Sequence, residues 1–337
     1  MKGVYKGYTH LKYKPSETDL VCEFHVEPAK GVSMRTASEA VAAEPSVGTW
    51  TEVKTAGPDI MRKAAKVFYV KPPCVRIAYP GELFEAGNMP CILSSVAGNV
   101  FGMKDVNNLR LEDIHWPEWL MKSFKGPLHG IPGVRKLLKV PKRPLCGTII
   151  KPKLGLGWKE HAKVAYEAWR GGLDIVKDDE NLTSQNFNRF EERVNETLKM
   201  RDRAEAETGE RKMYMANVSA ETNEMIRRAK FVRIAGGEYA MVDILTVGWA
   251  GLQTLRDVNE ELRLVLHTHR AGHAAMTRNK RHGISMMVIA DVARLIGVDQ
   301  LHIGTAVGKM EGPKKEVMEL GEEMENGFLA EKGHRMS

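Results

Sequence analysis

The sequence has little cysteine and no long apolar run. Its 337 residues include four cysteines, none of them in a CxxC pair. A disulfide framework or a thiolate zinc site is therefore not expected, and the reducing cytoplasm is the expected location. The segment Pro90–Met103 carries no charge, but it is too short and too polar to span a bilayer. Residues 1–19 contain no apolar block, so no signal peptide is expected.

Charge of one sign is also not concentrated in any segment. Lys and Arg outnumber Asp and Glu by 50 to 43, which gives a formal net charge of +7. Because no basic tail is present, we expect no nucleic-acid partner, and an anionic small substrate suits the sign of the charge. The apolar fraction of 43% with 28% charged residues excludes a largely disordered chain. The length favours two domains.

The pattern of the sequence changes near residue 146. Before that point, short β-like runs at Asp19–Glu27, Val67–Tyr69 and Val75–Tyr79 alternate with helical stretches. We therefore expect an N-terminal α+β domain of ferredoxin-like type over residues 1–125. A connector rich in Gly and Pro is expected over 126–146, and a β/α domain over 147–337.

Six apolar runs in the second part alternate with helical periodicity. The expected strands are 147–152, 173–179, 213–220, 239–245, 264–270 and 300–305. One helix is predicted by the apolar stripe Phe187, Phe190, Val194 and Leu198, and Gly209 is expected to end it. Strand–helix units repeating at roughly 31 residues indicate a (β/α) barrel of the TIM type. The sequence accounts for six of its eight strands, so an incomplete barrel is expected.

Polar residues gather at the ends of these runs, where β/α barrels place their active sites. Lys177 and Asp179 are two apart and share one face of a strand, whereas Asp178 points to the other face. Glu180 follows the strand and can turn back to the side of Lys177. Two carboxylates alone make a modest Mg²⁺ site, but CO₂ added to a neutral lysine amine gives an anionic carbamate with oxygen ligands. Burial would lower the pKa of the amine and favour that addition. A solvated cluster of salt bridges is the alternative interpretation.

Several segments together resemble the large subunit of ribulose-1,5-bisphosphate carboxylase/oxygenase (RuBisCO). They read GTIIKPKLG at 147–155, KDDEN at 177–181, HTHRAGH at 267–273, HIGTAVGK at 302–309, EPSVGTW at 44–50 and GNVFG at 98–102. The resemblance runs in order from about residue 12 to about residue 312. Ile149 stands where plant-type enzymes have Thr, so the sequence is most similar to the archaeal form III group.

The resemblance implies a Mg²⁺-dependent carboxylation of ribulose 1,5-bisphosphate to two 3-phosphoglycerates, with oxygenation as a side reaction. The implied metal ligands are Lys177, carbamylated by an activating CO₂, together with Asp179 and Glu180. The implied catalytic residues are Lys151 as acid/base, His269 as general base and Lys309 in a closing loop. Taken without the family, His269 could be a core histidine and Lys309 a surface lysine.

Substrate-binding residues are also implied by the resemblance. Arg270 and His302 would bind a phosphate, and Lys153 would contact the substrate. Four residues of the first domain, Glu44, Thr49, Trp50 and Asn99, would complete the site of a neighbouring subunit, so a homodimer or higher homo-oligomer is implied. His273 is expected to pack rather than to act.

The sequence departs from the family at its C-terminal end. The family barrel has a seventh strand with a Ser-Gly-Gly phosphate loop and an eighth with a run of glycines, whereas here Glu316–Ser337 is polar. We therefore expect either a C-terminally truncated chain or a separate chain that supplies the missing strands. Three alternatives stay open. They are an inactive subunit that associates with full-length subunits, a RuBisCO-like enolase, and a zinc amidohydrolase, in which the HxH pair would precede the lysine.

Overall fold

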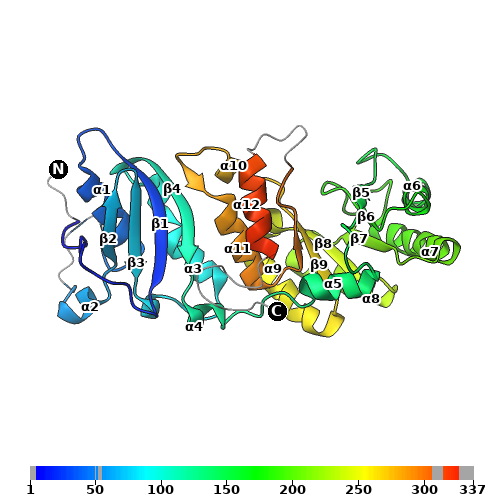
Figure 1. The fold of residues 1–337 in the computed structure, drawn as a ribbon, viewed down its shortest axis with the longest axis horizontal. Helices are drawn as coiled ribbons and strands as arrows, with labels where there is room; N and C mark the ends of the chain where they lie inside the picture. The colour runs from blue at the N-terminus through cyan, green and yellow to red at the C-terminus, as the bar shows by residue number, and fades with distance from the viewer. Residues whose placement is uncertain (1–4, 50, 52–54, 306–313, 326–337) are drawn as a thin grey trace. The chain divides into compact units, whose positions relative to one another are not determined.

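The structure is a computed structural model that describes residues 5–49, 51, 55–305 and 314–325 (Figure 1). Two of the predicted site residues, Trp50 and Lys309, lie outside these residues. The chain forms two compact units. Of the described residues, those within 5–124 and 273–292 form the first unit, and those within 125–272 and 293–325 form the second. Among the described residues, no helix combines the length and the apolar character needed to cross a membrane.

The first unit is built on a five-stranded sheet with the order β10-β4-β1-β3-β2. Its strands are β1 (Leu20–Pro28), β2 (Lys66–Lys71), β3 (Cys74–Tyr79), β4 (Val106–His115) and β10 (Gly283–Ile284). The strands β2, β3, β1 and β4 are antiparallel, and β10 joins β4 in parallel. The three β-like runs expected in this part of the sequence are confirmed as β1, β2 and β3.

Short helices complete the first unit. They are α1 (Met34–Ala43), α2 (Pro58–Arg62), η1 (Gly81–Leu83), α3 (Met89–Val96), η2 (Asn99–Gly102), α4 (Glu118–Met121) and α10 (Ala274–Thr277). Alternate residues of β1, from Leu20 to Val26, are fully buried, and α1 packs its alanine-rich face on the sheet. Such alternation is typical of a strand with one face on the core.

The second unit contains a curled sheet of six parallel strands in the order β11-β9-β8-β7-β6-β5. They are β5 (Gly147–Ile149), β6 (Ile175–Lys177), β7 (Met213–Asn217), β8 (Tyr239–Asp243), β9 (Val265–His269) and β11 (Gln300–Leu301). All six lie within the expected runs but are shorter than these runs. In the part of the chain that the structure describes, β5 and β11 each pair with one strand only. The expected half-closed barrel is confirmed.

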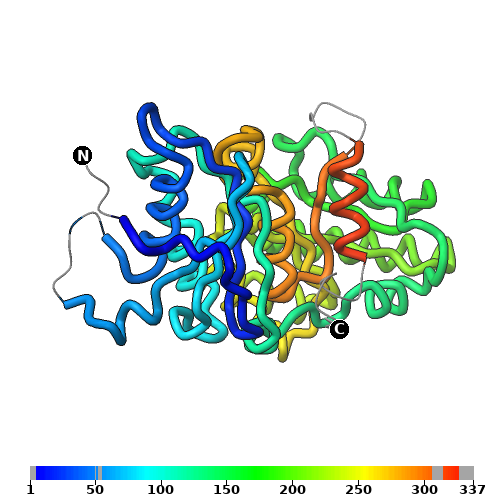
Figure 2. The backbone as a smooth tube through the Cα atoms, turned by 60° about the vertical axis from the view of Figure 1, so that its left-hand side comes forward, coloured from blue at the N-terminus to red at the C-terminus, as the bar shows by residue number. Residues whose placement is uncertain are grey.

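Helices precede, connect and follow these strands along the chain, and the colours of Figure 2 show the order of the segments. They are α5 (Gly130–Leu138), α6 (Trp158–Arg170), α7 (Phe190–Thr208), α8 (Thr222–Ile234), α9 (Ile244–Leu262), α11 (Met286–Ile296) and α12 (Lys314–Glu325). The helix α7 ends at Gly209, whose φ of +70° suits a residue without a Cβ atom. Phe187 was expected on its apolar stripe, but it precedes the helix and is 42% exposed.

The core of the second unit lies inside the curl of the sheet. Val134 and Leu138 of α5 pack there on inward-facing residues of four successive strands, Ile175, Met213, Met215, Tyr239, Met241 and Val265. The register pairs Lys177 with Ile149 of β5 on one side and with Met215 of β7 on the other, so an apolar residue lies beside it on each neighbouring strand. The sheet thereby buries the aliphatic part of the Lys177 side chain, and the Lys177 amine lies at the carboxyl edge of the strands.

Candidate active site

Lys177 is the last residue of β6 and lies at the centre of the candidate site. The residue is 5% exposed, and its Nζ donates a hydrogen bond of 2.7 Å to the main-chain oxygen of Asp178. Glu180 Oε2 lies 4.0 Å from the same nitrogen, so Glu180 does turn back toward Lys177 as expected. Burial lowers the pKa of Lys177 even though Glu180 and neighbouring carboxylates oppose the shift. The neutral amine is therefore more accessible here than in an exposed lysine.

Asp179 follows on the same face and pairs with Lys151 of the loop after β5. Lys151 Nζ lies 2.6 Å from Asp179 Oδ2, and Asn181 donates to Asp179 Oδ1 from its main-chain and side-chain nitrogens at 3.2 and 3.1 Å. Burial alone would raise the pKa of Asp179, but the hydrogen bonds from Lys151 and Asn181 outweigh it and lower the pKa. Asp179 is therefore an ionised carboxylate near Lys177.

His269 at the end of β9 joins this group through two carboxylates. Its Nδ1 lies 2.8 Å from Asp243 Oδ1, and its Nε2 lies 3.8 Å from Glu180 Oε2. The Asp243 contact settles which nitrogen carries the proton, because a carboxylate accepts from Nδ1–H and leaves Nε2 as the basic atom. Asp243 was missed from the sequence. Its signal was a single carboxylate within the otherwise apolar run 239–245.

Three further basic side chains lie within or just after β9 and β11, namely His267, Arg270 and His302. The rings of His269 and His302 meet edge to face at 5.5 Å between centroids. Burial, with the nearby His269 and Arg270, lowers the pKa of His302 to about 4. Burial also lowers the pKa of His267 to about 3, so both rings are neutral near pH 7. The Arg270 guanidinium packs on Gly304, where a Cβ atom would lie 2.4 Å from Nη2.

The remaining predicted site residues belong to the loop after β5 and to the first unit. Lys153 is exposed in the loop after β5. Within the first unit, Asn99 Nδ2 donates to Glu44 Oε1 at 3.3 Å, which brings together two residues that the sequence pattern placed in one site. Thr49 is half-buried. His273 lies 2.9 Å from the Thr277 hydroxyl at the start of α10 and belongs to the first unit.

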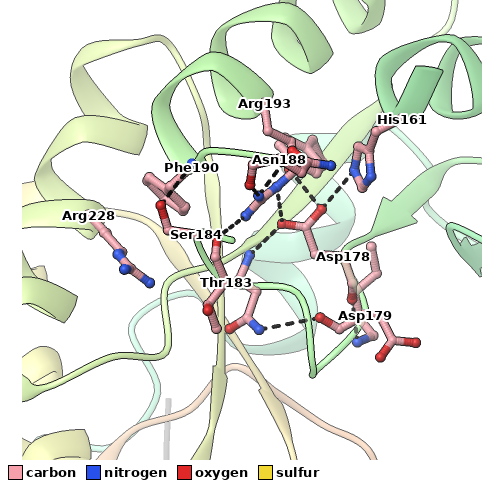
Figure 3. A network of polar contacts seen from close by, with 12 residues as sticks. His161, Asp178, Asp179, Thr183, Ser184, Asn188, Phe190, Arg193 and Arg228 are labelled. Carbon is pink, nitrogen blue, oxygen red and sulfur yellow. Dashed lines mark hydrogen bonds and ion pairs between the residues drawn. The ribbon is translucent and has the colours of Figure 1, made fainter. Parts of the chain in front are cut away.

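Asp178 points away from Lys177 and Asp179, as strand geometry predicts, into a buried polar network (Figure 3). Arg193 Nε and the Tyr214 hydroxyl donate to its carboxylate at 3.2 and 2.8 Å, and His161 Nε2 lies 3.0 Å away. Burial alone would raise the pKa of Asp178, but Arg193 and His161 outweigh it and hold the pKa well below its usual range. The sequence analysis missed Arg193, Tyr214 and His161, because each lies in a different helix or strand.

Asp179, Glu180 and Lys177 are the residues that could hold a metal ion in this site. Among the described residues, no three His, Cys, Asp or Glu side chains are grouped to hold one. Asp179 and Glu180 supply two carboxylates beside Lys177, so a third oxygen ligand would have to come from Lys177 itself. A carbamate on that amine would complete a set of oxygen ligands, which is the kind that Mg²⁺ takes. The residues therefore fit the Mg²⁺ site that the sequence suggested.

Family models match almost the whole chain. The N-terminal domain of the ribulose bisphosphate carboxylase large chain matches residues 7–120, and its catalytic domain matches residues 130–335. A ribulose bisphosphate carboxylase of Methanosarcina mazei is 53% identical over 94% of this chain and 74% of its own length. One from Methanocaldococcus jannaschii is 50% identical over 94% of this chain and 76% of its own.

Solved structures give the same result. An octameric RuBisCO from Pyrococcus horikoshii matches with a TM-score of 0.90 and 48% sequence identity. The matched part is 93% of this chain and 74% of the Pyrococcus chain. A dimeric archaeal RuBisCO from Hyperthermus butylicus matches with a TM-score of 0.88 and 46% sequence identity. The matched part is again 93% of this chain and 74% of the other chain. The resemblance identified from the motifs is thus confirmed over both units. The chain belongs to the ribulose bisphosphate carboxylase large chain family, alongside archaeal members.

Proposed function

We propose that this chain is a ribulose-bisphosphate carboxylase of the archaeal form III type. It would add CO₂ and water to ribulose 1,5-bisphosphate and give two 3-phosphoglycerates, with O₂ as a competing substrate. The observation that carries the proposal is the buried Lys177 amine, with its lowered pKa, beside Asp179 and Glu180. Membership of the carboxylase family removes the zinc amidohydrolase alternative.

Activation would begin at Lys177. Its neutral amine attacks the carbon of CO₂, a C–N bond forms, and the nitrogen loses a proton to solvent. The product is an anionic carbamate whose oxygen, with the carboxylates of Asp179 and Glu180, would hold Mg²⁺. When bound there, Mg²⁺ supplies Lewis-acid polarisation of the substrate carbonyl. The apolar residues beside Lys177 on the neighbouring strands favour the first step, because they disfavour its ammonium form.

Two residues would then move protons. Lys151 lies against Asp179 at 2.6 Å and would act as acid/base near the reacting carbons. His269 would accept a proton at Nε2 in a later hydration step. Its partner Asp243 supports that role, since the contact at Nδ1 fixes the ring orientation and stabilises the protonated ring.

Phosphate binding would use hydrogen-bond donors that follow the strands β5, β9 and β11. The planar Arg270 guanidinium suits a phosphate, and His302 and Lys153 would add donors. Lys309 would stabilise the new carboxylate from a loop that closes over the site. The Glu44–Asn99 pair, with Thr49 and Trp50, would complete the site of a neighbouring subunit.

An active site that takes residues from two neighbouring subunits requires a homo-oligomer. The dimeric and octameric archaeal structures support a homo-oligomeric state for this chain. A separate chain that adds strands beside β5 and β11 stays a further prediction, as does a cytoplasmic location. The domain limits 1–125, 126–146 and 147–337 are also kept as proposals.

Fixation of radiolabelled CO₂ tests the function. Purified chain with Mg²⁺ and ribulose 1,5-bisphosphate should fix label, and Lys177→Ala should reduce the rate by at least about 100-fold because a ligand of the metal is lost. Lys163→Ala is the matched control, since Lys163 is an exposed lysine in α6. Fixation that survives Lys177→Ala would contradict the metal assignment.

The same assay separates the remaining alternatives. A chain that binds Mg²⁺ but fixes no label would favour a RuBisCO-like enolase. Fixation that appears only after mixing with a full-length relative would favour the associating subunit.

A further inference from the structure

The two carboxylate residues of the candidate metal site share one main-chain anchor. Asn217, the last residue of β7, donates from Nδ2 to the main-chain oxygens of Asp179 at 3.3 Å and of Glu180 at 3.1 Å. The side chain of Asn217 is fully buried. A single amide group therefore holds the backbone of both residues.

This anchor begins where the strand ladder stops. The parallel pairing of β6 with β7 ends at Lys177 and Met215, and the last main-chain bond runs from Asp178 N to Met215 O at 3.1 Å. Beyond it the main chain of Asp179 and Glu180 leaves the sheet. The Asn217 amide thus takes the place of ladder hydrogen bonds for the two residues that follow Lys177.

Asn217 is itself held from two sides. Its Oδ1 accepts from Ser219 N at 3.0 Å, and its main-chain nitrogen donates to Asp178 Oδ2 at 3.0 Å. Asp178 is in turn paired with Arg193, which is fully buried and also donates to the main-chain oxygen of Thr183 at 2.7 Å. The amide is therefore fixed by contacts that do not include Lys177, Asp179 or Glu180 side chains.

The contacts also continue toward the general base. The Ser219 hydroxyl accepts from Asp243 N at 2.9 Å, and the Asp243 carboxylate holds His269. Asn217 therefore connects the two carboxylate residues that follow β6 with the contacts that hold His269 at the end of β9. A residue in that place sets the positions of ligands without touching the metal or the substrate.

We propose that Asn217 is a positioning residue for the metal-binding group. It holds the main chain at Asp179 and Glu180 so that both carboxylates face Lys177 before a cation binds. The inference rests on the proposed function, because it concerns the same site. Partners that orient metal ligands typically change metal affinity about 10- to 100-fold when they are removed.

The test measures the carbamate rather than turnover. The full chain is equilibrated with ¹³C-labelled CO₂ at a series of Mg²⁺ concentrations, and the carbamate resonance that Lys177→Ala abolishes is followed by ¹³C NMR. Asn217→Ala should raise the Mg²⁺ concentration for half-maximal carbamate by about 10- to 100-fold. Asn217→Ser, whose short hydroxyl cannot reach both carbonyls, takes its place if the alanine variant does not fold.

A second buried asparagine provides the matched control. Asn259 is also fully buried, donates from Nδ2 to Leu264 O at 2.7 Å and accepts from Leu264 N at 3.0 Å. It holds the chain before β9, at the opposite end of the strands from Lys177. Asn259→Ala should lower the thermal midpoint as Asn217→Ala does, but leave the Mg²⁺ dependence unchanged.

The possible results separate this inference from the proposed function. A wild-type Mg²⁺ dependence in Asn217→Ala, within about twofold, would overturn the positioning role while leaving the carboxylase proposal intact. Equal shifts in Asn217→Ala and Asn259→Ala would also overturn it, since general destabilisation would then explain both. A wild-type chain without any carbamate at Lys177 would overturn the proposed metal site itself.

Discussion

Lys177 is the residue on which the chemistry depends, and its environment sets the pH at which it can react. Burial lowers the pKa of its amine, while Glu180 is the largest influence that opposes the shift. An amine adds CO₂ only in its neutral form. At a fixed concentration of dissolved CO₂, carbamate should therefore increase as pH rises through the lowered pKa of Lys177, which lies below the value of about 10.4 typical of an exposed lysine.

This prediction is checked in Mg²⁺-free buffer by ¹³C NMR of the carbamate across pH. Glu180→Gln removes a negative charge that favours the ammonium form, so its profile should move to lower pH. A wild-type midpoint at the pKa of an ordinary lysine would contradict the role of burial. An unmoved Glu180→Gln profile would contradict the role of Glu180.

Some residue contacts could be predicted from the sequence, and others could not. The placement of Lys177 and Asp179 on one face, with Asp178 on the other, follows from the two-residue period of a strand. Asp243 and Asn217 were not predicted, because their roles depend on which strands become neighbours. Nothing local to either residue shows that it reaches across the sheet.

At the scale of elements, Asp299 connects a helix to two strands. Its Oδ1 accepts from the main-chain nitrogens of His129 and Gly130 at 2.6 and 2.9 Å, at the start of α5. Its Oδ2 accepts from Leu266 N of β9 at 2.9 Å. One carboxylate thus satisfies the first turn of the helix that covers the interior of the sheet, as a capping residue does, but from the segment just before β11.

Asp299→Ala should therefore destabilise the second unit by about 2 kcal/mol, since three main-chain donors lose their acceptor. Amide hydrogen exchange in α5 should become faster, and the urea midpoint should fall. Asp299→Asn keeps one acceptor and should have an intermediate effect. Glu261→Ala, at an exposed position of α9, is the control. Unchanged exchange in α5 would show that the helix is held by its apolar contacts alone.

The elements themselves were largely predictable. Six apolar runs became the six strands, since buried parallel strands need continuous apolar residues. The strand ends were not predictable from the runs, because some runs continue into loop residues such as Lys151 and the run 239–245 continues into α9 at Ile244. Phe187 was wrongly assigned to a helix stripe, since spacing alone cannot show that the turn before α7 leaves it exposed.

At the scale of the whole molecule, two units were predicted from the sequence. That the segment 273–292 belongs to the first unit was not predicted. That segment follows β9 along the chain, yet it contributes β10 to the sheet of the first unit. Its anchor is Arg110 of β4, which donates to the main-chain oxygens of Thr277 and Asn279 at 3.1 and 2.7 Å. A buried arginine that satisfies distant carbonyls leaves no periodic signal in the sequence.

The proposed sharing of sites between subunits makes a prediction that involves both units. Glu44→Gln would inactivate the part contributed by the first unit, and Lys177→Ala the part contributed by the second. Each variant alone should fix no label. If each site takes its two parts from different chains, a mixed dimer has one intact site and one site with both changes. Refolding equal amounts together should then restore about one quarter of the wild-type rate. A mixture that stays inactive, although size-exclusion shows mixed oligomers, would mean that both parts of a site come from the same chain.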